Sequence, residues 1–223
     1  MYSILEAEKS LSLLDNPCLS GLVHRTKGEI YGSECLFQNA LVEYQKSKEY
    51  FDKAELSFHS AYALYNIATA YSKLRDYDNA IKYLLKSEEQ FSENGYSLYQ
   101  FETQIELCYN YLQIDDFNSC ANVFARIDKS AKIGYSYCDY YCIYAILSAH
   151  SGNFVDAKTY ISKAKTEQII NPMQLAYSEY KIIRLQGNDT EALNFHLQMV
   201  AEQDKFVFNA INNSLLQSQV DLL

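Results

Sequence analysis

The stretch from residue 61 to residue 91, AYALYNIATAYSKLRDYDNAIKYLLKSEEQF, decides the fold, because it contains two apolar helical faces separated by a polar break. In its first half, Leu64, Ile67 and Tyr71 recur at spacings of three and four residues, which places them on one face of an α-helix. Residues 73–79 are mostly polar, and a second apolar face follows them. We therefore predict an αα-hairpin, in which neither helix can bury its apolar face alone.

The same pattern recurs along the chain with a period of 35 to 40 residues. Small residues are expected to open the second helix of each hairpin, at Ala40, Ala80, Cys120, Ala157 and Ala192. Other small residues fall inside each first helix, at Gly28, Ala68, Cys108 and Ala145. We expect the two series to face each other, because large side chains there would force the helices apart. An aromatic residue also recurs in the turn, at Phe37, Tyr77, Phe117 and Phe154, and a repeat array is predicted.

The quoted stretch resembles the tetratricopeptide repeat (TPR) family. The residues in the register of that family are Asn66, Ala68, Tyr71, Asp76, Tyr77, Ala80, Ile81 and Lys86. The resemblance implies an all-α fold, a right-handed α-α superhelix of about five helical hairpins with terminal capping helices. Standard units have about 34 residues, so we expect the extra residues of these repeats at the end of each second helix.

We predict a single solenoid over residues 1–223. Its expected parts are an N-terminal helix at 1–17 that is a cap or half repeat, repeats at 21–60, 61–100, 101–137 and 138–172, a degenerate repeat at 173–203, and a capping helix at 204–223. The apolar face of the first helix is typical of the second helix of a hairpin. The chain is therefore expected either to carry a cap or to be cut from a longer array.

Charge and hydropathy exclude several classes of function. The net charge is −9 and the sequence pI is about 4.9, with no stripe of Lys and Arg, so direct binding of nucleic acid is not expected. No apolar run is long enough to span a membrane, and the N-terminus lacks the pattern of a signal peptide. The six cysteines favour free thiols in a reducing compartment. We expect a cytoplasmic protein, or a periplasmic one if a signal or anchor has been removed.

The sequence contains no convincing catalytic or metal-binding constellation. Cys138 and Cys142 are four residues apart and could form half of a metal site, but no further ligands lie at a suitable spacing, so packing is favoured. The four histidines are scattered over different repeats, and phosphate-binding and nucleophile motifs are absent. We predict a protein that is not an enzyme, with no catalytic residues, no metal and no cofactor.

The resemblance to TPR proteins implies a concave groove lined by the first helix of each hairpin. The groove positions of the family fall here on Arg25, Glu29, Tyr62, Tyr65, Asn66, Thr69, Lys73, Glu102, Ile105, Glu106, Tyr109, Asp139, Cys142 and Ile146. An ordinary solvated face is the alternative. The apolar residues in this set favour a ligand, because a purely solvated face has little reason to carry them.

The charge of this groove indicates the kind of ligand. TPR domains that hold acidic chaperone tails use Lys, Arg and Asn, whereas Glu29, Glu102 and Glu106 occupy those places here. We therefore expect a peptide or protein segment with basic and apolar side chains. The favoured function is a non-enzymatic binding scaffold. The alternative is a peptide-sensing or regulatory segment of a larger bacterial regulator. The oligomeric state is left open.

Overall fold

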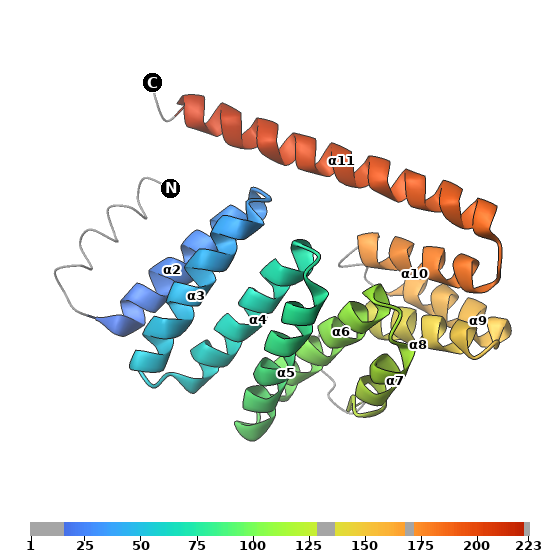
Figure 1. Ribbon diagram of the computed structural model, residues 1–223, viewed down its shortest axis with the longest axis horizontal. Helices are drawn as coiled ribbons and strands as arrows, with labels where there is room; N and C mark the ends of the chain where they lie inside the picture. The colour runs from blue at the N-terminus through green and yellow to red at the C-terminus, as the bar shows by residue number, and fades with distance from the viewer. Residues whose placement is uncertain (1–15, 129–136, 168–171, 221–223) are drawn as a thin grey trace. The chain divides into compact units, whose positions relative to one another are not determined.

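The structure of the protein is a computed structural model that describes residues 16–128, 137–167 and 172–220. Within these ranges it contains ten α-helices, α2 to α11, and no strand, which confirms the all-α prediction (Figure 1). The chain divides into two compact units. The first comprises residues up to Ile114 together with 209–223, and the second comprises residues 115–208. The predicted N-terminal helix at 1–17 lies almost entirely outside the described residues.

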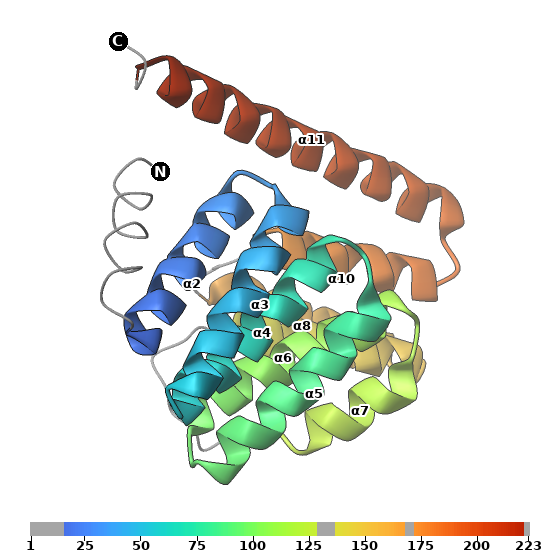
Figure 2. The same ribbon diagram turned by 60° about the vertical axis from the view of Figure 1, so that its left-hand side comes forward.

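The first unit is built from helices of equal length. They are α2 (Pro17–Ser33), α3 (Phe37–Lys53), α4 (Ser57–Lys73), α5 (Tyr77–Glu93) and α6 (Ser97–Gln113), each of 17 residues. Each helix packs on the next, and Figure 2 shows them running up and down in turn. The prediction that each second helix is extended is wrong for these hairpins. The period of 40 arises because each repeat contains two helices of 17 residues and two turns of three residues, so the extra residues are shared by both helices.

The second unit contains α7 (Phe117–Ala125), α8 (Cys138–His150), α9 (Phe154–Thr166), α10 (Pro172–Leu185) and α11 (Asp189–Val220). Helices α8 and α9 form a hairpin, and α10 packs on α8. The predicted boundary between a degenerate repeat and a capping helix at residues 203 and 204 is wrong, because α11 runs through it without a break. No Gly or Pro near that point would end a helix.

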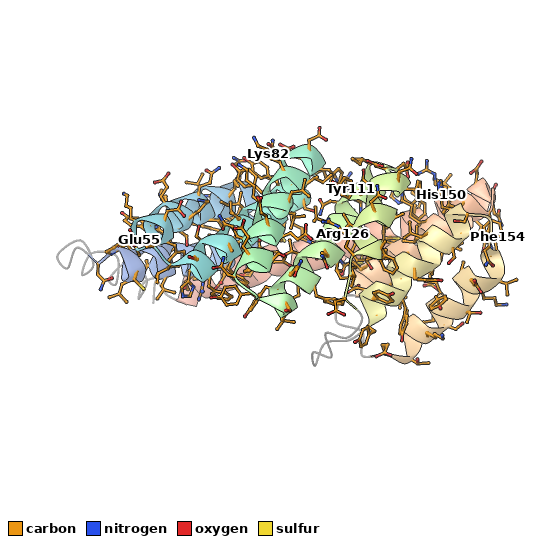
Figure 3. All side chains as sticks on the ribbon, turned by 90° about the horizontal axis from the view of Figure 1, so that it is seen from below. Glu55, Lys82, Tyr111, Arg126, His150 and Phe154 are labelled. Atoms are coloured by element: carbon orange, nitrogen blue, oxygen red, sulfur yellow. The ribbon has the colours of Figure 1, made fainter. Side chains whose placement is uncertain are left out.

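Seven turns between helices in the described ranges each contain a left-handed residue. Positive φ angles between 54° and 80° occur at Cys35, Glu55, Arg75, Gly95, Asp115, Gly152 and Gly187. At the first of these turns, the N–H groups of Cys35 and Leu36 donate to the carbonyls of Gly32 and Tyr31, which is the Schellman arrangement. Glu55, labelled in Figure 3, occupies the same point between α3 and α4. These tight turns fix where each helix ends.

Small residues allow the hairpin helices to approach closely, as predicted. The members of both small series up to Ala157 are buried in the structure, namely Gly28, Ala40, Ala68, Ala80, Cys108, Cys120, Ala145 and Ala157. Gly28 does not meet Ala40 first, however. A Cβ atom placed on it would lie 2.5 Å from the ring of Tyr44. Likewise a Cβ on Gly21 would lie 2.6 Å from the ring of Phe51. Bulky rings on α3 therefore fill the space that the glycines of α2 leave.

Candidate functional site

A row of aromatic rings runs along α4 and continues onto α6 in the first unit. Phe58, Tyr62 and Tyr65 recur at spacings of four and three residues, and the centroids of neighbouring rings lie 6.2 and 6.0 Å apart. Tyr99 of α6 approaches Tyr62 edge to face at 5.9 Å. These are favourable geometries for aromatic pairs. Since Tyr62 and Tyr65 are half-buried, the row offers ring faces and edges at the surface.

Charged groups from α2 and α6 surround this row. Burial, together with the nearby carboxylates of Glu29 and Glu102, raises the pKa of Tyr62. Arg25 lies 3.3 Å from Glu29 in an ion pair one helical turn apart, so its positive charge is already compensated. The structure therefore brings Arg25, Glu29, Tyr62 and Glu102 together from three helices. We call the set Arg25, Glu29, Tyr62, Tyr65, Asn66, Tyr99 and Glu102 the tyrosine surface.

Asn66 carries an unsatisfied amide at the buried base of this surface. It lies one turn after Tyr62 on α4, is 8% exposed, and its Nδ2 atom has no hydrogen-bond partner within the described part of the chain. Burying an amide without a partner costs free energy, commonly about 1–3 kcal/mol. Because the protein encloses Nδ2, a ligand cannot reach this donor, and Asn66 does not line an open groove.

Four other predicted groove residues have less distinctive surroundings. Thr69 is half-buried and donates its hydroxyl to the carbonyl of Tyr65 at 3.0 Å. Lys73 is exposed at the end of α4, and Glu106 is half-buried on α6. Asp139 is half-buried in the first turn of α8, in the second unit.

Two predicted groove residues of α6 are buried. Ile105 and Tyr109 lie one turn apart on the same helix face, and the structure leaves almost none of either side chain exposed. Their assignment to an open groove is therefore wrong. Their apolar character reflects core packing rather than contact with a ligand.

The predicted groove residues of α8 are corrected in the same way. Cys142 and Ile146 are 0% exposed. The thiol of Cys142 contacts the side chain of Ser178 on α10, and burial raises its pKa to about 12. Because Ile146 lies one turn further along α8, it shares this covered face. Helix α10, the first helix of the next hairpin, therefore covers positions that the family resemblance assigned to a groove.

Sequence reasoning missed Tyr99 and Phe58, which complete the aromatic row. Tyr99 lies three residues before Glu102, so helical spacing could have placed both residues on one face. Phe58 lies four residues before Tyr62 and contacts the rings of both Tyr96 and Tyr99, at 4.9 and 4.8 Å. Extending the predicted face by one turn in each helix would have identified both.

A buried charge network holds α2 to α3. Nδ1 of His24 lies 2.7 Å from Oε2 of Glu43, and Nζ of Lys46 donates to Oε1 of Glu43 at 3.0 Å. Nζ of Lys27 lies 3.5 Å from the same carboxylate. Burial favours the neutral acid, but these neighbours outweigh it and hold the pKa of Glu43 below its ordinary value. The network is a structural element that sequence analysis did not anticipate.

The described residues, 16–128, 137–167 and 172–220, contain neither a metal-binding cluster nor a membrane-spanning helix. No group of three or more His, Cys, Asp and Glu side chains in those ranges is arranged to hold a metal ion. No described helix combines the length and the apolar character that crossing a bilayer requires.

The helical hairpins, the Schellman turns and the small residues between helices define a TPR-like helical-repeat fold. No protein-family model and no curated protein matches the sequence. Among solved structures, the apo form of RapI superposes with a TM-score of 0.68 at 18% identity, covering 93% of this chain and 78% of RapI. NprR in complex with its cognate peptide NprX gives a TM-score of 0.61 at 16% identity, covering 94% of this chain and 66% of NprR.

The TPR-like repeats of a putative kinesin light chain from Podosopora anserina also match. Their TM-score is 0.53 at 15% identity, with 82% of this chain and 94% of that chain covered. At such identities the likeness establishes the fold. It agrees with the resemblance inferred from the sequence.

Proposed function

We propose that the protein is a non-enzymatic binding module that holds a peptide or protein segment on the tyrosine surface. The observation that carries the proposal is the row of half-buried rings of Tyr62, Tyr65 and Tyr99, which lies beside the carboxylates of Glu29 and Glu102. These rings supply flat apolar area that loses little conformational entropy on binding.

The proposed ligand carries basic as well as apolar side chains. Glu29 and Glu102 flank the aromatic row, and the only cation of the set, Arg25, is paired with Glu29. A Lys or Arg side chain could lie over the face of a tyrosine, close to these carboxylates. The net charge of −9 favours a basic ligand over an acidic one.

A second candidate function is a peptide-sensing segment of a larger regulator. It is favoured by the likeness to NprR, whose structure holds its cognate peptide. The two candidates share the same surface and differ in what binding controls. An output domain encoded in the same reading frame would favour the regulator. We propose a cytoplasmic location for either function, since all six cysteines are free thiols.

The test begins with a library of randomised peptides displayed on phage and selected on the intact chain. The affinity of the best sequences is then measured by titration calorimetry. We expect selected peptides to be rich in Lys, Arg and apolar residues, and Tyr65→Ala to weaken binding about tenfold or more. Tyr83→Ala is the matched control, because Tyr83 stacks on Tyr71 away from the tyrosine surface. Equal affinity for both variants would contradict the proposal.

A further inference from the structure

The first half of α11 presents an apolar face to solvent. Leu193 and Leu197 are 58% and 57% exposed, and Val200 continues the same face. Another face of the helix is turned toward the protein, since Ala192 is buried and the ring of His196 lies 5.2 Å from that of Tyr180 in α10. Leu193 and Leu197 therefore lie beside the face by which α11 contacts its own chain, and Val200, one turn after His196, lies at the edge between the two.

Acidic residues bracket this face at both ends. Asp189 lies four residues before Leu193, and Asp204 lies four residues after Val200, so both share its side of the helix. Both aspartates are exposed. We call Asp189, Leu193, Leu197, Val200 and Asp204 the α11 face.

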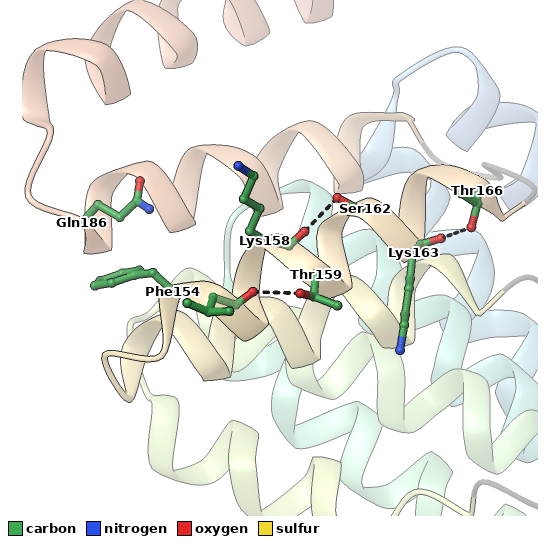
Figure 4. Close-up of a pocket in the computed structure, with 8 residues that line it drawn as sticks. Phe154, Lys158, Thr159, Ser162, Lys163, Thr166 and Gln186 are labelled. Carbon is green, nitrogen blue, oxygen red and sulfur yellow. Dashed lines mark hydrogen bonds between the residues drawn. The ribbon is translucent and has the colours of Figure 1, made fainter.

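A hollow of about 780 Å³ lies on the outer side of α9, in the same unit (Figure 4). Its floor consists of Val155, Thr159, Ser162 and Thr166, at spacings of four, three and four residues. The hydroxyls of Thr159, Ser162 and Thr166 donate to carbonyls of their own helix at 2.9, 2.9 and 2.7 Å. Because these hydroxyls are already satisfied, apolar side chains can cover the floor without leaving a polar group unpaired.

Lysines flank the floor of the hollow on both sides. Lys158 and Lys163 line it and are exposed. Helix α5 provides a comparison, because the repeat register places Asp78, Lys82, Leu85 and Glu89 at the positions of the α9 floor. Three of those four residues are charged, whereas the floor on α9 is uncharged. The hollow thus combines an uncharged floor with basic edges.

We propose that the α11 face of one copy of this chain docks in the α9 hollow of a second copy. Both surfaces follow the four-and-three spacing by which packed helices interlock. Leu193 and Leu197 are larger than the Thr159 and Ser162 side chains at the centre of the floor. Asp189 and Asp204 carry the charge opposite to that of Lys158 and Lys163. Since one chain carries both halves of this contact, a second copy is the occupant that the chemistry selects. Two such contacts, related by a two-fold axis, would close a dimer.

Sedimentation velocity measures the self-association of the wild-type chain. Concentrations up to about 100 μM detect contacts of modest affinity. We expect the wild-type chain to self-associate. The double variant Lys158→Glu with Lys163→Glu should associate at least roughly tenfold more weakly, because it places like charges across the contact. The double variant Asp189→Lys with Asp204→Lys should do the same. Circular dichroism checks that the helix content of each variant is unchanged.

The matched control is Lys82→Glu with Lys86→Glu on α5, which changes the net charge equally at exposed positions of the other unit (Lys82 is labelled in Figure 3). It should associate like the wild type. An equimolar mixture of the α9 and α11 variants should recover association, since every contact between unlike copies then pairs opposite charges.

A wild-type chain that stays monomeric would overturn the proposal. So would an α9 variant that associates like the wild type, because the α11 faces would then be pairing with each other or with another surface. A mixture of the two variants that remains monomeric would also overturn it. None of these outcomes depends on peptide binding at the tyrosine surface.

Discussion

The hydroxyl of Ser87 in α5 donates a 2.9 Å hydrogen bond to the carbonyl of Ala61 in α4, 26 residues earlier in the chain. The preceding hairpin repeats this bond, from Ser47 to the carbonyl of Gly21 at 2.8 Å. Both serines are fully buried. The two helices of each of these two hairpins are therefore joined by the same polar contact as well as by apolar packing.

Removal of this contact should lower stability. We expect Ser87→Ala to reduce the free energy of unfolding by about 0.5–1.5 kcal/mol, the net contribution of a buried hydrogen bond. Urea denaturation measures the change. Ser92→Ala, at an exposed position of the same helix, makes the same substitution without removing a contact between helices and should be nearly neutral. Equal effects for the two variants would mean that the bond contributes nothing.

The glycines of α2 give a sharper test of hairpin packing. Gly28→Ala places a methyl group 2.5 Å from the ring of Tyr44, so we expect a loss of about 1–3 kcal/mol in the free energy of unfolding. Gly32→Ala on the same helix is the control, because its nearest neighbour, the Tyr44 hydroxyl, lies at 3.7 Å. That variant should gain up to about 1 kcal/mol from better helix propensity. Thermal melts in which both variants shift the same way would contradict this packing.

Replacing the non-glycine residues of the left-handed turns by glycine should maintain or raise the stability of the protein. Glu55 has a φ of 54° and Arg75 a φ of 62°, a conformation that costs roughly 1–2 kcal/mol for residues with a Cβ atom. Glu55→Gly and Arg75→Gly should be neutral or up to about 1 kcal/mol more stable, after the larger entropy of glycine in the unfolded chain is counted. Glu49→Gly, inside α3, should instead lose about 1 kcal/mol. Chemical denaturation of the three variants separates turn geometry from a general effect of glycine.

The network around Glu43 should make stability depend on pH. A carboxyl whose pKa is lower in the folded chain than in the unfolded chain contributes stability above its unfolded value and loses that contribution as the pH falls. The difference in free energy of unfolding between wild type and Glu43→Gln should therefore be largest above about pH 5 and shrink below about pH 4. The exposed Glu49→Gln is the control. A difference that stays constant down to about pH 3 would contradict the role assigned to His24, Lys27 and Lys46.

The sequence predicted the repeat and its close contacts well, because Ala68, Ala80 and their equivalents follow a local rule of helix approach. It predicted the groove less well. Tertiary packing decides whether a residue in the first helix of a hairpin faces a ligand or the first helix of the next hairpin. Cys142, for example, lies on the face of α8 that α10 covers. The enclosure of the Asn66 amide and the charge network at Glu43 also depend on residues distant in sequence. No periodicity within one helix encodes such partners.

Photo-crosslinking can locate a bound peptide on the protein and so tests whether it lies on the tyrosine surface. A selected peptide carrying benzoylphenylalanine in place of one apolar residue is irradiated with the intact protein, and the modified residues are identified by mass spectrometry. We expect adducts on α2, α4 and α6, at or next to Tyr65, Asn66 and Glu102. Adducts confined to α9 and α11, or spread evenly over the chain, would contradict this expectation.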